Sequence, residues 1–247
     1  MAAVQPGATG VGPDRAAGHA DHMVKLVLWR HGRTSWNAER RFQGHSDVPL
    51  DATGHEQARD AARYLAAMHP DAIVSSDLVR AAETASYLAE LTGLPVQLDK
   101  DLRERGGGAW EGLTDAEIRA GYPEAYAAWV PPDGESIDVV ADRAAAALTR
   151  VADGLDGTLA VLVSHGAAIN FGISRLLGVP PRARLLGPLG NCSWSVLGRR
   201  SGHWRLLEHN VGQLPDLDPE QVPVPAAGPE QETPAESARG SAPGSDR

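Results

Sequence analysis

Short apolar runs alternate with longer amphipathic stretches through the middle of the chain. Three runs are almost entirely apolar, as is typical of strands buried on both faces of a sheet: 24–29, 72–75 and 159–163. Elsewhere apolar residues recur at helical spacing, which predicts helices over 54–68, 77–92, 114–129 with a break near Pro123, 136–153 and 166–177. Two of these helices have a Ser/Thr-x-x-Glu capping box at their start, at Thr53–Glu56 and Thr114–Glu117.

This alternation predicts an α/β fold, in which a mostly parallel sheet is covered by helices on both faces. Two later runs, 192–197 and 203–208, alternate between apolar and polar residues and are separated by a segment that begins and ends with glycine. They predict a hairpin at one edge of the sheet. Cys192 begins the first run, so it is expected to be a structural strand residue rather than a nucleophile.

Both ends of the chain lack these patterns. Residues 1–22 are rich in Ala and Gly, and residues 213–247 hold seven of the 18 prolines. Each is predicted to be a disordered extension flanking one domain over 23–212, and the C-terminal one is acidic. Translation could start at Met1 or at Met23, which directly precedes the first apolar run.

Charge and composition narrow the functional classes. Most of the formal charge of −9 lies in the acidic tail, which leaves the segment 23–212 nearly balanced, at −3. This gives no basic surface for nucleic acid. No apolar run approaches the roughly 18 residues of a membrane span, and residues 1–22 show no cationic start followed by an apolar stretch, so we expect neither a membrane span nor a signal sequence. One cysteine excludes an intramolecular disulfide, and no metal-binding spacing occurs. We therefore expect a soluble, cytoplasmic protein, for which a homodimer is one assembly the sequence allows.

Polar side chains follow each of the three apolar strands. Arg30 and His31 follow the first, Ser75-Ser76-Asp77 leads from the second into a helix that carries Arg80, and His165 follows the third. Because ligands of open α/β sheets collect at the carboxyl ends of the strands, these groups are expected to converge. A neutral imidazole surrounded by cations can attack phosphorus. The pattern therefore predicts phosphoryl transfer through His31.

The leaving oxygen needs a proton donor, and Glu104 is the best candidate carboxyl group. Gly32 and Gly44 would let the chain approach a phosphate closely, and Asn37 and Gln43 could donate hydrogen bonds to it. Taken singly, these residues have ordinary structural interpretations: a histidine at a strand end is often only a hydrogen-bonded structural residue, an arginine an ion-pair partner and a glutamate a solvated charge. Their joint occurrence favours a catalytic site.

These motifs resemble those of the histidine phosphatase superfamily, the phosphoglycerate mutase-like proteins. Four segments carry the resemblance in the family's order: Arg30-His31-Gly32-Arg33-Thr34 with Asn37, Ser75 to Thr84, Leu102-Arg103-Glu104 followed by Gly108 to Gly112, and Ser164-His165-Gly166. The resemblance implies a three-layer α/β/α sandwich and a mechanism without metal or cofactor. It further implies that His31 takes the phosphoryl group, that Glu104 protonates the leaving oxygen and then activates water, and that other residues hold the phosphate or line the pocket: Arg30, Arg80, His165, Asn37, Gln43, Gly44 and Gly166.

Within this family the sequence favours a phosphatase. The segment between Glu104 and His165 is shorter than in the family's mutases and has no adjacent Arg-Arg pair, and Ala167 stands where mutases carry Asn. Asn170 also departs from the common Arg. The substrate would be a small phosphorylated metabolite. The segments Gly190 to Trp194 and Trp204 to Leu206 resemble the end of glucosyl-3-phosphoglycerate phosphatases, so that sugar phosphate is one candidate. The alternatives are a 2,3-bisphosphoglycerate-dependent phosphoglycerate mutase and a non-catalytic phosphate-binding module.

Overall fold

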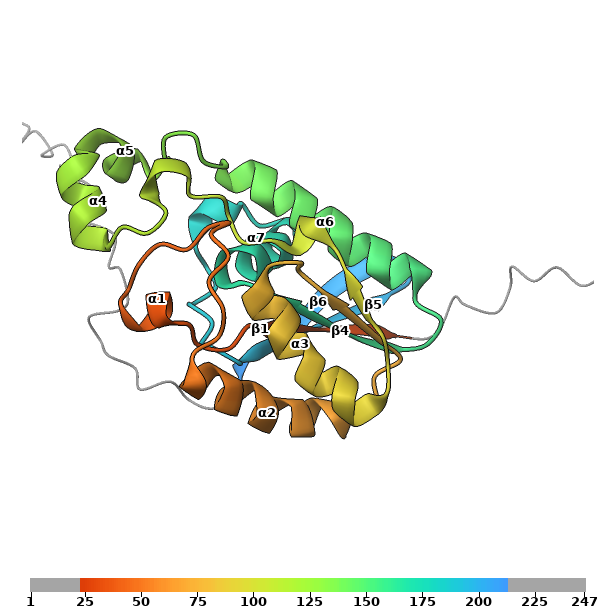
Figure 1. The fold of residues 1–247 in the computed structure, drawn as a ribbon. Coiled ribbons are helices and arrows are strands. Elements are labelled where there is room, and N and C mark those ends of the chain that lie inside the picture. Colours follow the sequence, from red (N-terminus) through yellow and green to blue (C-terminus); the bar gives the residue numbers. More distant parts are fainter. Residues whose placement is uncertain (1–22, 213–247) are drawn as a thin grey trace, which may run out of the picture. The chain divides into compact units, whose positions relative to one another are not determined.

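The computed structural model describes residues 23–212, and within them one sheet forms the centre of the fold (Figure 1). Its strands lie in the order β3-β2-β4-β1-β5-β6. Their bounds are β1 Val24–Arg30, β2 Ala72–Ser75, β3 Val96–Leu98, β4 Leu159–Ser164, β5 Trp194–Arg200 and β6 His203–Val211. The first four strands pair in parallel, whereas β5 runs antiparallel to β1 and β6 antiparallel to β5. The predicted mostly parallel sheet with an edge hairpin is confirmed.

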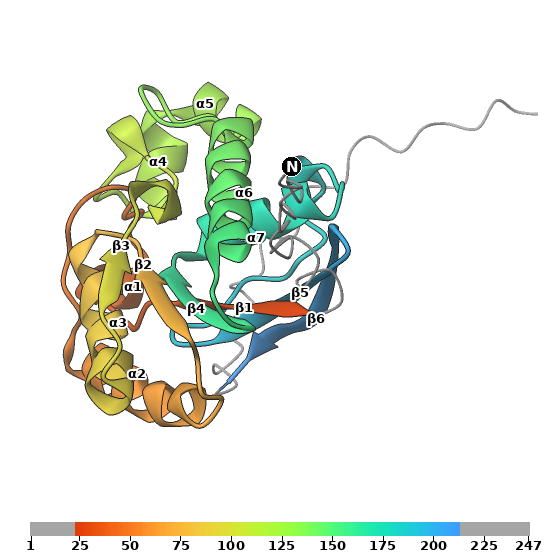
Figure 2. The same cartoon turned by 90° about the vertical axis from the view of Figure 1, so that its right-hand side faces the viewer.

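Helices cover both faces of this sheet (Figure 2). Their bounds are α1 Ser35–Ala38, α2 Ala52–Ala66, α3 Val79–Thr92, α4 Asp115–Gly121, α5 Pro123–Ala128, α6 Ile137–Gly154 and α7 Gly166–Leu176, with short 3-10 turns η1 Lys100–Leu102, η2 Gly108–Trp110 and η3 Pro181–Ala183. Alternate residues of β1 enter two separate cores, because successive strand side chains point to opposite faces. Val27 and Trp29 pack with α2 and α3, and Leu26 and Leu28 pack with α6 and α7. This is the expected three-layer sandwich.

One of the two predicted capping boxes forms. Thr114 caps α4 reciprocally with Glu117, as the sequence predicts. The box at Thr53 is wrong, because α2 already begins at Ala52 and Asp51 caps it by accepting a hydrogen bond from Gly54 N at 2.8 Å. The Thr53 hydroxyl instead accepts a hydrogen bond from Arg33 at 2.8 Å. The N-cap of α2 is therefore Asp51, two positions before the predicted Thr53, and the local sequence pattern did not distinguish between these two residues.

Several element boundaries also differ from the prediction. The strand β3 and the one-turn helix α1 were not predicted, because both are too short to show a period. Pro123 does separate α4 from α5. The hairpin strands extend further than expected, and the turn contracts to Ser201-Gly202, both with positive φ (49° and 78°), as tight hairpin turns require. Cys192 is not a strand residue: it lies buried in a turn before β5, with φ 56°.

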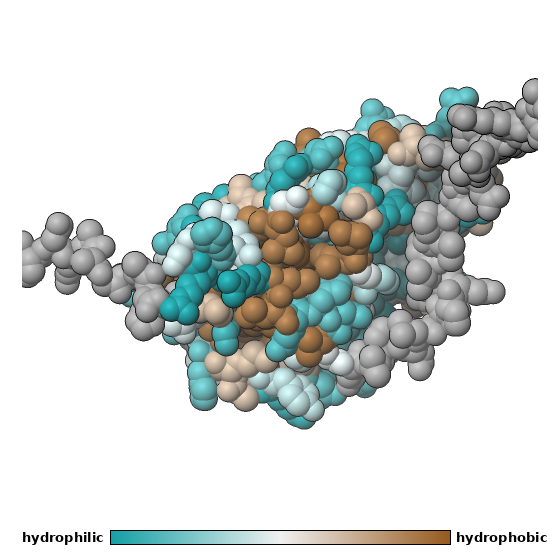
Figure 3. Space-filling view, turned by 180° about the vertical axis from the view of Figure 1, so that it is seen from behind, coloured by the Kyte–Doolittle hydropathy of each residue, from teal (hydrophilic) through white to brown (hydrophobic). Residues whose placement is uncertain are grey.

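Other predictions concern the surface and the ends of the chain. Within residues 23–212, no helix is long and apolar enough to cross a membrane. Figure 3 shows hydrophobic residues gathered on the face opposite to the view of Figure 1. Exposed apolar area can mark an interface, but the homodimer stays a prediction. The extensions at 1–22 and 213–247 lie outside the described residues, so their predicted disorder and the choice of start codon also stay predictions.

Candidate active site

The predicted histidines meet where β1 and β4 end. These strands are neighbours, Arg30 is in register with Ser164, and His31 N donates to the Ser164 carbonyl at 3.0 Å. The ring centroids of His31 and His165 are consequently 5.0 Å apart, and both rings are buried. The parallel pairing of two strands more than 120 residues apart in sequence therefore builds the centre of the site.

The His31 ring is fixed in one tautomer by the neighbouring backbone. Its Nδ1 lies 2.7 Å from the Gly32 carbonyl oxygen, which can only accept, so Nδ1 carries the hydrogen and the Nε2 lone pair is left for another partner. Burial holds the pKa of His31 well below its ordinary value, and the positive charges of Arg80 and Arg30 lower it further. The imidazole is therefore neutral at physiological pH, as a nucleophile must be.

Two buried guanidinium groups flank this ring. Arg80, in the first turn of α3, donates to the carbonyls of Gly44 and Ser46 at 2.8 Å each, and Arg30 donates to the carbonyl of Leu189. Burial lowers the pKa of Arg80 to about 10, which leaves it charged at neutral pH. The Nε atoms of both arginines are buried and have no hydrogen-bond partner among residues 23–212. Buried donors of this kind are normally satisfied, so an anion that accepts from them fits the site.

Glu104 lies beside the amino end of α7, the helix that begins directly after His165. Its carboxylate accepts hydrogen bonds from Arg105 N at 2.8 Å and from the backbone N–H groups of Ala167 and Ala168 at 3.2 Å each. Gly166 is the first residue of this helix. The charge of Glu104 also acts on the buried guanidinium of Arg30. A carboxylate therefore stands beside the two cationic groups.

His165 is held by one nitrogen only. Its Nε2 lies 2.9 Å from the hydroxyl of Ser76, and its Nδ1 is buried with no partner in the described part of the chain. Burial holds its pKa well below the ordinary value, and Arg80 lowers it further. A neutral ring with one unsatisfied nitrogen, beside His31, can contact an oxygen of a bound anion.

Of the predicted pocket residues, Asn37, Gln43 and Gly44 lie in the segment that follows β1, which includes the short helix α1. The side-chain oxygen of Asn37, Oδ1, accepts hydrogen bonds from Thr34, and the side-chain oxygen of Gln43, Oε1, accepts one from the Thr34 hydroxyl at 3.1 Å. The side-chain NH₂ groups of Asn37 and Gln43 are then the donors that a substrate could use. Gly44 has φ 52°, and a Cβ there would come within 2.1 Å of the Glu111 carboxylate. This position therefore requires glycine.

Sequence reasoning did not assign roles to several residues that hold the site in place. Glu111 accepts hydrogen bonds from the backbone of His45, Ser46 and Gly107, and so fixes the loop whose carbonyls hold Arg80. Arg143, on α6, donates to the carbonyls of Arg103 and Glu104 at 2.6 and 2.7 Å. Neither residue carries a local signal of this role, although Glu111 lies within one of the quoted motifs. Their partners come from distant segments.

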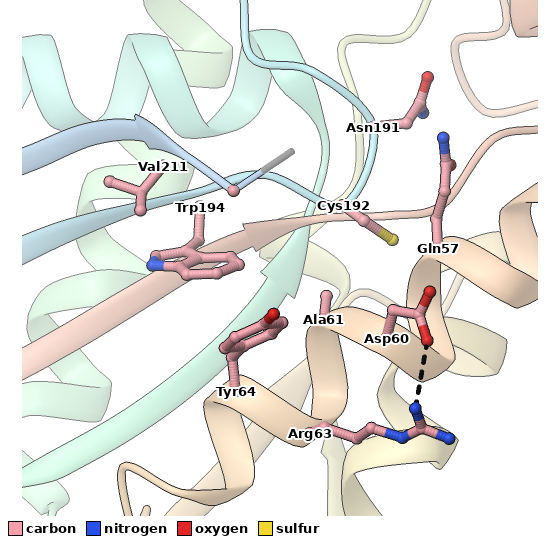
Figure 4. Close-up of a pocket in the computed structure, with 10 residues that line it drawn as sticks. Gln57, Asp60, Ala61, Arg63, Tyr64, Asn191, Cys192, Trp194 and Val211 are labelled. Atoms are coloured by element: carbon pink, nitrogen blue, oxygen red, sulfur yellow. Dashed lines mark ion pairs between the residues drawn. The ribbon is translucent and has the colours of Figure 1, made fainter. Parts of the chain in front are cut away.

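A separate cavity lies outside this constellation (Figure 4). It has a volume of about 550 Å³ and lies between α2 and the end of the β5–β6 hairpin. An ion pair between Asp60 and Arg63, 3.6 Å long, stands at its edge. The residues that line it are Gln57, Asp60, Ala61, Arg63, Tyr64, Asn191, Cys192, Trp194, Val211 and Gly212, so it contains no member of the predicted catalytic set.

The fold and this arrangement of residues define the class of the protein. Residues 26–212 match the histidine phosphatase superfamily (branch 1), and the chain belongs to that family. The family and the enzyme class predicted from the motifs are confirmed.

Similar proteins carry more specific names. A glucosyl-3-phosphoglycerate phosphatase of Mycolicibacterium vanbaalenii is 41% identical over 208 residues, which cover 78% of this chain and 90% of that protein. A probable phosphoglycerate mutase GpmB of Escherichia coli is 38% identical over 206 residues, which cover 79% of this chain and 96% of that protein. The structure of a mycobacterial glucosyl-3-phosphoglycerate phosphatase complexed with VO3 matches with a TM-score of 0.71 and 40% identity, over 76% of this chain and all of that one.

Proposed function

We propose that this protein hydrolyses a phosphomonoester of a small phosphorylated metabolite through a phosphohistidine on His31. One observation carries the proposal: the buried, neutral His31 ring, with its Nδ1 hydrogen bonded to Gly32, stands between charged guanidinium groups whose Nε atoms lack partners. A nucleophile with a free lone pair, placed among donors that disperse charge on transferring oxygens, is suited to phosphoryl transfer.

The reaction has two steps. In the first, His31 Nε2 forms a bond to phosphorus, the bond from phosphorus to the leaving oxygen breaks, and Glu104 gives a proton to that oxygen. In the second, Glu104 takes a proton from water as the water oxygen bonds to phosphorus and the P–N bond breaks, which releases inorganic phosphate. Arg30, Arg80 and His165 hold the phosphoryl oxygens throughout, and Asn37, Gln43, Gly44 and Gly166 line the pocket.

Hydrolysis fits better than isomerisation. A mutase has to hold its substrate away from water until the phosphoryl group has returned to it. The segment between Glu104 and His165 lacks an adjacent Arg-Arg pair, and Ala167 stands at the amino end of α7 where the mutases carry Asn. The name GpmB among the relatives keeps the mutase as the second candidate.

The names of two similar proteins point to one substrate. Both are called glucosyl-3-phosphoglycerate phosphatase, and we propose the same compound for this chain. Comparable turnover of unrelated sugar phosphates, without preference for the glucosyl compound, would contradict this assignment. The reaction needs no metal in this scheme, because arginines supply the positive charge. The site is proposed to act on metabolites of the cytoplasm.

The decisive experiment is hydrolysis of p-nitrophenyl phosphate with EDTA present. Wild type is expected to be active and His31→Ala inactive. His203→Ala is the matched control, because His203 is an exposed histidine on β6 and should keep full activity. Brief incubation with a ³²P-labelled phosphoester should leave an acid-labile label on the wild-type protein and none on His31→Ala. An inactive wild type, or an active His31→Ala, would refute the mechanism. Formation of 2-phosphoglycerate from 3-phosphoglycerate with 2,3-bisphosphoglycerate would favour the mutase.

A further inference from the structure

One exposed arginine lies over an aromatic ring near the site and has no acidic partner. The guanidinium of Arg184, directly after η3, is 5.3 Å from the centroid of the Trp129 ring. The nearby Arg175 and Arg182 both pair with Asp138, whereas no carboxylate within residues 23–212 forms an ion pair with Arg184. Arg184 also has φ 48°, a conformation that is uncommon for a residue with a side chain. The structure thus holds a cation in a fixed place without neutralising it.

Trp129 is itself held in place by other side chains. Its ring contacts Trp110 and Tyr126, with centroids 5.2 and 5.6 Å apart. Trp110 is fully buried, so the ring of Trp129 rests on the core of the domain. A guanidinium that stacks on such a ring keeps its in-plane N–H groups free to donate, and loses less freedom when it binds an anion.

The pair lies on segments that contact residues of the site. The Trp129 carbonyl accepts a hydrogen bond of 3.0 Å from Arg105, the residue after the proposed proton donor Glu104. The segment that carries Arg184 continues to Leu189, whose carbonyl accepts from Arg30. These two contacts tie the segments of Trp129 and Arg184 to the residues next to Glu104 and His31, at the edge of the site.

The charge of Arg184 reaches the residue next to Glu104. Arg105 is buried, and its pKa is lowered chiefly by that burial. The carboxylates of Glu104 and Glu135 raise this pKa, whereas the charges of Arg182 and Arg184 lower it. Arg184 is therefore close enough to Arg105 for its charge to act there.

We propose that Arg184, stacked on Trp129, binds a carboxylate carried by the leaving group and so selects phosphoesters of hydroxy acids. The inference rests on the proposed function, since it takes Glu104 as the proton donor that marks the leaving-group side. A guanidinium suits a carboxylate because it offers paired N–H donors in the plane of the two oxygens. Arg184 is then a specificity residue rather than a part of the phosphoryl-transfer chemistry.

The test compares two substrates that differ at one carbon, 3-phosphoglycerate and glycerol 3-phosphate. Arg184→Gln should raise KM for 3-phosphoglycerate about tenfold and leave KM for glycerol 3-phosphate unchanged, with kcat for both within about twofold of wild type. Arg184→Lys, which keeps the charge, should have an intermediate KM for the carboxylated substrate. Arg199→Gln is the matched control, because Arg199 also lies 5.3 Å from a tryptophan ring, that of Trp204 on β6. It should change neither KM.

The outcomes separate the two proposals. A wild type that hydrolyses p-nitrophenyl phosphate but shows no change of KM for 3-phosphoglycerate in Arg184→Gln would overturn this inference and leave the phosphatase intact. Equal changes of KM for both substrates would also overturn it, because they would show a general effect on the site. A wild type inactive towards every phosphoester would remove the phosphatase and with it this inference.

Discussion

Arg143 gives the most demanding test of how Glu104, the proposed proton donor, is positioned. Its guanidinium donates to the carbonyls of Asp101, Arg103 and Glu104 at 2.9, 2.6 and 2.7 Å, and to both carboxylate oxygens of Glu135 at 2.9 and 2.7 Å. The side chain is only 15% exposed. Arg143→Met removes every one of these donors but keeps the length of the side chain, so the carbonyls that hold Glu104 lose their partner.

The expected loss of stability follows from the burial of this ion pair. Removing one partner of a buried ion pair costs about 3–5 kcal/mol, because the remaining charge is left uncompensated. We expect Arg143→Met to lose roughly that much free energy of unfolding, which lowers Tm by roughly 6–20 °C in a domain of this size. Arg150 is the matched control, seven residues later on α6. It pairs with Asp99 and Asp101 but is 55% exposed, so Arg150→Met should cost less than about 1 kcal/mol.

The assay is urea unfolding at pH 7, followed by far-UV circular dichroism, together with kcat/KM for p-nitrophenyl phosphate at a temperature where both variants are folded. Arg143→Met should also lower kcat/KM at least tenfold, since Glu104 loses its fixed backbone, whereas Arg150→Met should not. Equal stabilities of the two variants would refute the argument from burial. Full activity of a folded Arg143→Met would refute the positioning of Glu104.

Three further predictions concern other parts of the site. Gly44→Ala should lower kcat/KM for p-nitrophenyl phosphate at least tenfold, because the added Cβ would come within 2.1 Å of the Glu111 carboxylate. Gly93→Ala is the control: Gly93 has φ 72°, but no atom of the described residues lies within 4 Å of an added Cβ, so this variant should lose only about 1 kcal/mol of stability and no activity. The hydrogen bond to Glu135 raises the pKa of His45, so protonated His45 stabilises the fold fully below about pH 6.5, and that contribution is lost as pH rises through the folded value. Urea unfolding between pH 6 and 9 should show wild type losing its advantage over His45→Gln, and an advantage that grows with pH would contradict this sign. Burial raises the pKa of the Cys192 thiol to about 12, so the native protein should not react with Ellman's reagent at pH 8 until urea is added, and rapid labelling without urea would show the thiol to be accessible.

The core elements could be predicted because their signals are local. The runs at 24–29, 72–75 and 159–163 are almost entirely apolar, since both faces of those strands are covered by helices. Amphipathic spacing located α6 and α7, and the strand ends then brought the histidines together. The strand β3 and the helix α1 were not predicted, because each is too short for its residues to show a period.

By itself, the sequence determined the fold class and the family, and it predicted the residues of the candidate site, because strand ends and motifs are properties of contiguous segments. The tertiary structure decided how those residues act. Burial between Arg30 and Arg80 makes His31 neutral, and the Gly32 carbonyl selects its tautomer. Both effects depend on desolvation and on charges from distant segments, which no local pattern reports. The placement of Arg184 over Trp129 likewise joins segments more than 50 residues apart, and so became visible only in three dimensions.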